Sequence, residues 1–178
     1  MRLMSIDPAT ILGFAVGDAG AIPRSGAVRL RKPSQPRDVA AFNALCFLRD
    51  TWVLDKPDIV CVECFLNPVA QKSADAIILQ IEVYGVIVAL CQAYGIPYHS
   101  VQPATWRKHF CGQANAGERE ATKDMVIRRA KALKYLPPDC FENNRAEACG
   151  IFDYAAATYC RTPPARLVLF GERAEAGT

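Results

Sequence analysis

Short apolar runs alternate with longer stretches of helical periodicity along the chain. Five apolar runs predict strands at residues 2–7, 11–19, 26–31, 58–63 and 96–102. The first two are separated by Pro-Ala-Thr, which is typical of a hairpin whose first strand is broken by the proline. Helical spacing predicts helices at residues 38–54, 73–95, 103–110, 122–136 and 143–157. Three strands followed by alternating helices and strands indicate an α/β domain with a mixed sheet.

Two of the predicted helices carry further information. The helix at 38–54 has apolar residues at 41, 42, 45, 48, 52 and 53, and Asp38 is its expected N-cap. The helix at 73–95 ends at Gly95 and is apolar on nearly all sides. For a surface helix, that pattern predicts burial in a partner; the alternative is a central helix that the monomer itself covers.

Composition sets the scale of the molecule. With 178 residues, of which 51% are hydrophobic, the chain can build one core of ordinary size. We expect a single domain over 1–165 and a tail at 166–178. Since no run reaches about 18 apolar residues and Asp7 and Pro8 come early, we predict a cytoplasmic protein with no signal peptide and no membrane partner.

The eight cysteines do not form the paired motifs of a zinc site. The one Cys-x-x-Cys, Cys61 to Cys64, falls at a predicted strand, where residues three apart point to opposite faces. We therefore interpret the cysteines as small buried apolar residues rather than as disulfides or metal ligands.

Charge is unevenly distributed although the net charge is only +3. Residues 103–137 contain eight basic and three acidic side chains, a local excess of +5, and residues 24–37 hold a second basic run. The basic residues of the first run are Arg107, Lys108, Arg119, Lys123, Arg128, Arg129, Lys131 and Lys134. Clustered positive charge suits a polyanion such as DNA, and a solvated helix face is the alternative.

Two predicted apolar strands end in a carboxylate, Asp7 in one and Glu63 in the other. A carboxylate at the end of a buried strand is costly unless it is paired, protonated or bound to a metal. If the strands are neighbours, a pair of divalent ions held by several oxygen ligands becomes an attractive interpretation. The alternative is that both side chains reach solvent at the strand ends.

The predicted helix at 143–157 is apolar enough to lie on the sheet, so it could deliver a third carboxylate to these strand ends. A helix turns by about 100° per residue, which places Asn144 and Glu147 about 60° apart on one face and turns Asp153 about 120° away from Glu147. Glu147 is therefore the favoured acid. Asp153 fits an exposed position or a structural ion pair better.

In order and spacing, these motifs resemble the RuvC-type Holliday junction resolvases, which belong to the ribonuclease H-like nucleases. The motifs are an Asp in SIDPATILGFAV, a Glu in DIVCVECFL, lysines in WRKHFCG and ATKDMV, and the i, i+3 pair in NRAEACGI. The similarity spans roughly residues 2–160, and the phage branch of the family is the most similar. It implies a ribonuclease H-like fold with a five-stranded mixed sheet and helices on both faces.

The resemblance also implies roles for individual residues. Asp7 and Glu63 would be the first two metal ligands and Glu147 the final one. Asn144 stands where the family has an acid or a histidine, so it would contact metal through a neutral oxygen or through water. Lys123 would act in catalysis or on a DNA phosphate.

The DNA-binding candidates are Phe65, Arg107, Lys108, Lys123 and Arg128. Lys108 and Lys123 occupy positions where the family has lysines near the scissile phosphate. Phe65 lies near a position where the family carries an aromatic residue that can stack on unpaired bases; a core position for Phe65 fits equally well.

The function implied is a metal-dependent, structure-selective endodeoxyribonuclease that resolves four-way Holliday junctions in DNA recombination and repair. It would act as a homodimer with two Mg²⁺ or Mn²⁺ ions per active site, in a bacterial cytoplasm and encoded by the bacterium or a phage. One alternative is a nuclease of the same fold that cuts forks and flaps as well. Another is a non-catalytic branched-DNA-binding protein, if Asn144 marks a decayed site. A nucleotide-binding ATPase is disfavoured because the sequence has no Gly-rich phosphate loop.

Overall fold

The computed structural model describes residues 1–64 and 74–162. Five strands form one sheet: β1 (Arg2–Asp7), β2 (Ile11–Asp18), β3 (Arg24–Arg29), β4 (Ile59–Glu63) and β5 (Tyr98–Val101). The helices are α1 (Arg37–Leu54), α2 (Ala74–Tyr94), α3 (Pro103–Cys111), α4 (Arg119–Ala132) and α5 (Asn143–Tyr159). The boundary predicted between residues 165 and 166 lies outside the described residues.

The sheet order is β3-β2-β1-β4-β5, with β1 at the centre. β1 runs antiparallel to β2 and parallel to β4, and β4 runs parallel to β5. The predicted hairpin and the predicted mixed sheet are therefore confirmed. Ile6 is paired with Val62, so the carboxyl ends of β1 and β4 lie side by side at one edge of the sheet.

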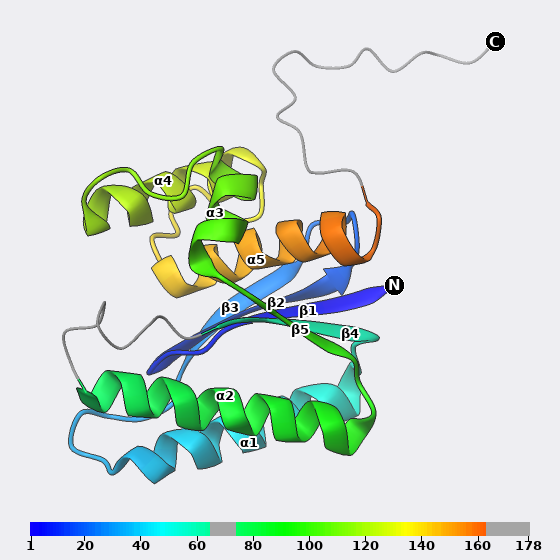
Figure 1. Ribbon diagram of the computed structural model, residues 1–178, viewed down its shortest axis with the longest axis vertical. Coiled ribbons are helices and arrows are strands. Elements are labelled where there is room, and N and C mark those ends of the chain that lie inside the picture. The colour runs from blue at the N-terminus through cyan, green and yellow to red at the C-terminus, as the bar shows by residue number, and fades with distance from the viewer. Residues whose placement is uncertain (65–73, 163–178) are drawn as a thin grey trace.

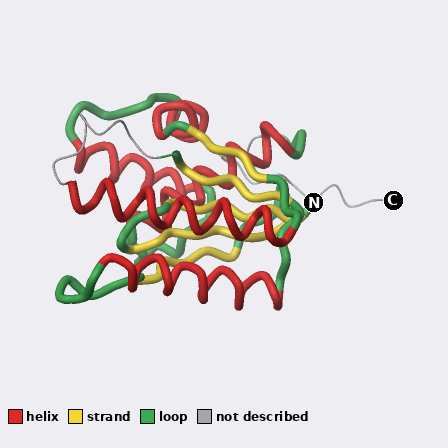
Figure 2. Tube along the Cα trace, turned by 60° about the horizontal axis from the view of Figure 1, so that its bottom comes forward, coloured by secondary structure: helices red, strands yellow, loops and turns green. Residues whose placement is uncertain are grey.

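Helices cover both faces of this sheet. Figure 1 shows α1 and α2 below the strands and α3, α4 and α5 above them, and Figure 2 shows the strands as one twisted layer between the helices. Because side chains alternate along a strand, Met4 and Ile6 pack toward α1 and α2, whereas Leu3 and Ser5 face α5. The two faces therefore belong to two separate cores.

The buried stripe of α1 differs from the predicted one. Ala40, Ala44, Leu48 and Trp52 are buried at i, i+4 spacing, while Phe42, Leu45 and Val53 are exposed. The two alanines belong to the core that α1 shares with α2 and the lower face of the sheet. Apolar identity alone therefore misplaced the inner face of this helix.

Several element boundaries also differ from the prediction. α1 begins at Arg37 after the N-cap Pro36, so Asp38 lies in the first turn and its prediction as the cap is wrong. The third strand is two residues earlier than predicted, because Arg24 to Arg29 pair with β2. The basic helix spans 119–132 rather than 122–136.

The predicted end of α2 is confirmed. Gly95 has a φ of 62°, and the amide of Ile96 donates to the carbonyl of Cys91 at 2.8 Å, as in a Schellman motif. By length and composition alone α2 could cross a membrane, but core helices of soluble proteins pass the same test. Here its Leu79, Val83 and Ile87 are buried in the core beneath the sheet.

The cysteines divide between the core and its margin. Cys61, Cys91 and Cys149 are buried as predicted, and the other five are half-buried. All eight are free thiols.

Candidate active site

Three carboxylates converge at the edge where β1 and β4 end. Asp7 is the last residue of β1, Glu63 is the last residue of β4, and Glu147 lies in the second turn of α5. Their exposed fractions are only 4%, 5% and 9%. Parallel pairing of β1 with β4 explains why the first two are neighbours, and packing of α5 on the sheet adds the third.

α5 is fixed on the sheet by a close backbone approach. The carbonyl of Asn144 lies against Gly13, where an added Cβ would be only 2.0 Å from its oxygen. One turn later, the hydroxyl of Ser5 donates to the carbonyl of Ala148 at 2.7 Å. Because Gly13 pairs with Asp7 across the β1–β2 hairpin, this contact brings the start of α5 to the carboxylates.

A buried tryptophan orients Glu63. The indole N–H of Trp106, from α3, donates to Oε1 of Glu63 at 2.8 Å. The ring fits because α5 has Gly150 beneath it, where an added Cβ would lie 2.5 Å from Cζ3 of Trp106. A glycine in a helix interior costs about 1 kcal/mol relative to alanine, so its presence here reflects the room that Trp106 needs.

Arg107 is the cation of this site. Its guanidinium donates to Oε1 of Glu147 at 2.8 Å and lies 4.0 Å from Oε1 of Glu63. The side chain is half-buried, so solvent screens this charge less than at the surface. One guanidinium cannot balance three ionised carboxylates, which leaves the site short of positive charge.

The two strand-end acids hold protons more tightly than usual. Burial raises the pKa of Asp7 well above its ordinary range, and the neighbouring charges of Glu63 and Glu147 raise it further. Burial also raises the pKa of Glu63, and the nearby charge of Glu147 raises it further. These two buried acids are neighbours at the ends of paired strands, so we expect them to share a proton when no metal is bound.

The donor set fits hard divalent cations. Carboxylate oxygens are the preferred ligands of Mg²⁺ and Mn²⁺, and the charge deficit described above would be relieved by cations. Within residues 1–64 and 74–162 no three acidic, His or Cys side chains are closed around one ion position. The Arg107 guanidinium contacts two of the three carboxylates instead.

The other predicted site residues lie apart from the carboxylates. Lys123 pairs with Glu120 at 2.8 Å on the surface of α4, and Arg128 bonds the carbonyl of Asp124. Lys108 lines an open hollow of about 500 Å³ on the outer side of α3, together with Thr105. Their DNA-binding roles stay predictions, and so does that of Phe65, which lies outside the described residues.

Asn144 is not directed at the carboxylates. Its side-chain amide donates to the carbonyl of Ile11 on β2. The preceding residue, Asn143, contacts the acid cluster instead, since its amide donates to Oε2 of Glu147 at 3.2 Å. The role of Asn144 as a ligand therefore stays a prediction, and its observed contact does not support it.

Asp153 has structural partners. The hydroxyl of Tyr135 donates to one of its oxygens at 2.9 Å, and Nε2 of His109 lies 3.2 Å from the other. It is buried on the same helix as Glu147 but away from the strand ends. These contacts agree with a structural ion pair.

Sequence reasoning missed three parts of the site: the bond from Trp106 to Glu63, the contacts of Arg107 with two acids, and the use of Asn143. Trp106 and Arg107 precede Lys108 in the quoted motif WRKHFCG, but their targets are more than 35 residues away in sequence. A single sequence carries no signal of such contacts. The one local signal was Gly150, because a glycine within an apolar helix indicates close packing against another element.

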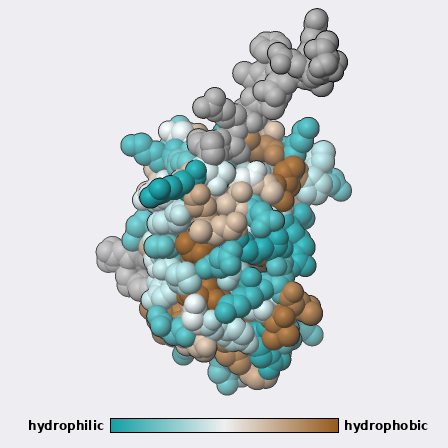
Figure 3. All heavy atoms as spheres, turned by 90° about the vertical axis from the view of Figure 1, so that its right-hand side faces the viewer, coloured by the Kyte–Doolittle hydropathy of each residue, from teal (hydrophilic) through white to brown (hydrophobic). Residues whose placement is uncertain are grey.

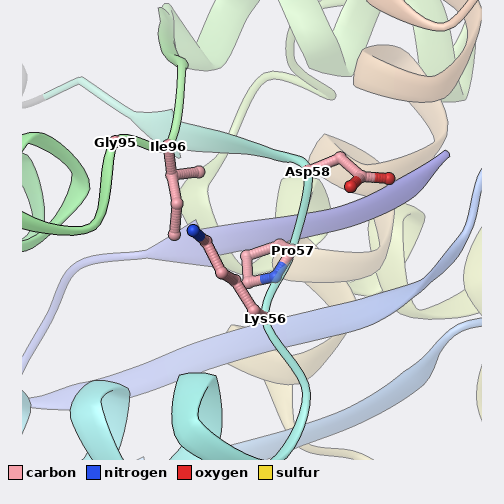
Figure 4. A pocket seen from close by; sticks show the side chains of 5 residues that line it. All are labelled: Lys56, Pro57, Asp58, Gly95 and Ile96. Carbon is pink, nitrogen blue, oxygen red and sulfur yellow. The ribbon is translucent and has the colours of Figure 1, made fainter.

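A separate cavity lies at the opposite edge of the sheet. It has a volume of about 300 Å³ and is lined by Lys56, Pro57, Asp58, Gly95 and Ile96. Figure 4 shows Lys56 reaching toward Ile96, and its ammonium donates to the carbonyl of Tyr94 at 2.8 Å. These residues precede β4 and β5, whereas Asp7 and Glu63 are at the carboxyl ends of β1 and β4, so the cavity is not part of the carboxylate site.

Comparison with solved structures identifies the fold. The chain superposes on Thermus thermophilus RuvC in complex with a Holliday junction substrate with a TM-score of 0.67 and 19% identity, covering 90% of this chain and 95% of that one. A second T. thermophilus RuvC structure gives 0.64 and 19%, over 93% and 99%. The yeast mitochondrial Holliday junction resolvase gives 0.54 and 11%, over 90% and 82%. No protein-family model and no curated protein matches the sequence.

The predicted ribonuclease H-like fold class is thus confirmed. The five-stranded mixed sheet, the helices on both of its faces and these structural neighbours all agree with it. Because the sequence identities are only 19% and 11%, the structural similarity establishes the fold and does not by itself assign an activity. The chain has the fold of the RuvC-type Holliday junction resolvases.

Proposed function

We propose that this protein is a metal-dependent endodeoxyribonuclease that resolves four-way DNA junctions. The observation that carries the proposal is the convergence of Asp7, Glu63 and Glu147, all buried, at one edge of a RuvC-type sheet. Three buried acids with one arginine between them are costly for folding alone. A function that uses them explains why they are present.

Two Mg²⁺ or Mn²⁺ ions held by these carboxylates would activate a water for attack on a phosphodiester and stabilise the leaving oxygen. Asp7 lies beside Glu63 and within the electrostatic reach of Glu147, so it is best placed to contact both ions. The Trp106 N–H keeps Oε1 of Glu63 in place at 2.8 Å. Asp7 and Glu63 would release their shared proton when the ions bind.

Positive charge near the site supports a DNA substrate. Arg107 already sits at the carboxylates, and Lys108 lies next to it in sequence on the outer side of α3. α4 adds Lys123 and Arg128 from the same layer of helices. Contacts of this kind neutralise backbone phosphates without reading base sequence, which suits recognition by DNA shape.

The outer face of α2 supports a homodimer. Ile78 and Ile81 are 39% and 43% exposed, and the same face continues through Gly85 and Ala89, which are also exposed. Figure 3 shows hydrophobic side chains among those at the lower end of the molecule, where α1 and α2 lie in Figure 1. Two copies of an active site related by a two-fold axis would cut two equivalent strands of a four-way junction.

The dimer can be tested separately from cleavage. Ile81→Glu would place a charge in the proposed interface and is expected to convert a dimer to a monomer in analytical ultracentrifugation. Val53→Glu, at an exposed apolar position of α1, is the matched control and should leave the dimer intact. A wild-type monomer at micromolar concentration would contradict the assignment of a homodimer.

A cleavage assay tests the activity itself. Synthetic four-way junction, fork, flap and duplex DNA are incubated with the protein, with and without Mg²⁺ or Mn²⁺. Symmetric cuts on the junction that vanish in EDTA and in Glu147→Gln would support the proposal, with the exposed Asp50→Asn as control. Equal cutting of the junction, the fork and the flap but not of the duplex would instead favour a nuclease of broad branched-DNA selectivity, and equal cutting of all four substrates would contradict structure selectivity. Tight junction binding without cutting would favour a non-catalytic binding protein.

This activity requires access to DNA and to free divalent cations. In a bacterial cell both are present in the cytoplasm, whether the protein is encoded by the bacterium or by a phage. The proposal therefore agrees with a cytoplasmic protein.

A further inference from the structure

Two consecutive asparagines begin α5, and the structure uses them differently. Asn144 donates its side-chain amide to the carbonyl of Ile11, and its own carbonyl rests against Gly13. Both contacts attach the helix to β2. Asn144 is thus engaged in docking the helix, on the side turned toward the hairpin.

Asn143 faces the acid cluster. Its amide nitrogen donates to Oε2 of Glu147 at 3.2 Å, while Arg107 occupies Oε1 of the same carboxylate at 2.8 Å. An ionised carboxylate only accepts hydrogen bonds, so it is the nitrogen of Asn143 that points to Glu147. This identifies Oδ1 of Asn143 as the remaining polar atom.

Among the residues that the structure describes, that oxygen has no hydrogen-bond partner. Oδ1 of Asn143 is buried and makes no hydrogen bond to any described residue. A buried acceptor without a partner costs about 1–3 kcal/mol, so native structures usually supply one. Since the atom belongs to a side chain in contact with Glu147, its missing partner should lie at the carboxylate site.

Helix geometry favours the same residue. Positions four apart differ by about 40° around a helix, whereas positions three apart differ by about 60°. Asn143 therefore lies closer in angle to Glu147 than Asn144 does. Its amide oxygen is also suitable chemically, because amide oxygens are accepted ligands of hard divalent cations.

We propose that Asn143, rather than Asn144, supplies the neutral oxygen ligand of the metal site next to Glu147. The inference rests on the proposed function, because it assigns a ligand to the metal centre that this function requires.

Mn²⁺ binding in the absence of DNA tests this assignment. The full-length wild type, Asn143→Ala and Asn144→Ala are titrated with Mn²⁺ by calorimetry, and circular dichroism establishes that each is folded. Loss of a ligand should weaken Mn²⁺ binding of Asn143→Ala by about tenfold or more. Asn144→Ala should bind Mn²⁺ within about twofold of the wild type. If Asn144→Ala fails to fold, the comparison of Asn143→Ala with the wild type still tests whether Asn143 is a ligand.

A pair of charge variants distinguishes a ligand from a residue that only positions Glu147. Asn143→Asp keeps an oxygen but loses the donor to Glu147, and Asn144→Asp adds the same charge one residue away. A ligand role predicts tighter Mn²⁺ binding by Asn143→Asp than by Asn144→Asp. Weaker binding by Asn143→Asp than by Asn143→Ala would overturn the ligand role.

The remaining outcomes separate this inference from the proposed function. Wild-type affinity in Asn143→Ala would overturn the assignment even if junctions are cut. Mn²⁺ binding that depends on Asn143, without cleavage of any DNA, would support the ligand and contradict the nuclease. A wild type that binds no Mn²⁺ would overturn both.

Discussion

The two faces of one sheet differ in what they bury. Toward α1 and α2, the inward side chains of β1 and β4 are Met4, Ile6, Val60 and Val62, all apolar. Toward α5, the alternate positions of the same strands include Ser5, Asp7 and Glu63. The described buried polar residues are Ser5, Asp7, Glu63, Thr122, Glu147 and Asp153.

In this small domain, stability and the charged site are associated with different faces of the sheet. Burial of apolar surface on the α1 and α2 face stabilises the fold, and none of the buried acids among residues 1–64 and 74–162 belongs to that core. The α5 face retains a large apolar core but accepts buried acids, each of which costs free energy unless it is paired or protonated. We therefore expect substitutions on one face to change mainly stability, and those at the carboxylates to change mainly activity.

The largest expected effect is on cleavage and comes from Asp7→Asn. If Asp7 holds both ions as proposed, its loss removes several kcal/mol of transition-state stabilisation, so cleavage should fall by on the order of a thousandfold. Because the substitution removes a buried acid, the metal-free protein should be at least as stable as the wild type in urea denaturation. A marked loss of stability would contradict the expectation that substitutions at the carboxylates change mainly activity.

The largest effect on stability should come from Leu48→Ala on the opposite face. Leu48 is fully buried between α1 and the sheet, so its truncation should lower the free energy of unfolding by about 2–5 kcal/mol. Leu54→Ala, at an exposed position of the same helix, is the control and should change it by less than about 0.5 kcal/mol. At a temperature where both variants are folded, each should cut junctions at the wild-type rate.

The pH dependence of stability should arise at the carboxylates. Burial raises the pKa of Asp7 and raises that of Glu63 to about 7. Between the unfolded pKa of about 4 and that value the folded state binds more protons than the unfolded chain, so stability falls as pH rises. We expect a loss on the order of a few kcal/mol between pH 4.5 and 8 in EDTA, measured by urea denaturation.

Two controls sharpen the pH prediction. Glu63→Gln should flatten the dependence, because the glutamine side chain has no proton to lose. Saturating Mn²⁺ should also reduce the loss of stability at pH 8, since the ions replace the protons. Asp55, whose pKa is lowered by its bond to Arg2, affects stability only at more acidic pH. An unchanged slope in Glu63→Gln would place the titrating group elsewhere.

The smallest predicted effect connects packing with the site. Gly150→Ala brings a methyl group against Trp106, which should cost about 1–3 kcal/mol of stability and disturb the bond to Glu63. Cleavage should fall modestly as well, so this variant should change both stability and activity. Trp106→Phe, which retains a ring but no N–H, should lower cleavage with a smaller loss of stability. Wild-type cleavage by both variants would show that the indole bond does not position Glu63.

The sequence by itself determined the strands, the order of helices and the strand-end acids, because these depend on local periodicity and on short spacing. The pattern also singled out Glu147 over Asp153, since helical geometry relates residues on one helix. On α1 the predicted positions Leu48 and Trp52 are buried, but the small residues Ala40 and Ala44, rather than Phe42 and Leu45, complete the buried side.

The tertiary structure alone decided how the helices are rotated and which side chains meet. Docking of α5 on β2 engages the side chain of Asn144 with the carbonyl of Ile11, so that Asn143, and not Asn144, contacts Glu147. Packing of α3 on α5 brings Arg107 to two acids that lie 40 or more residues away in sequence. Neighbouring residues on a helix differ by about 100°, so the rotation of a helix about its axis decides which of its side chains face the sheet. That rotation is set by backbone contacts between distant segments, which no local pattern specifies.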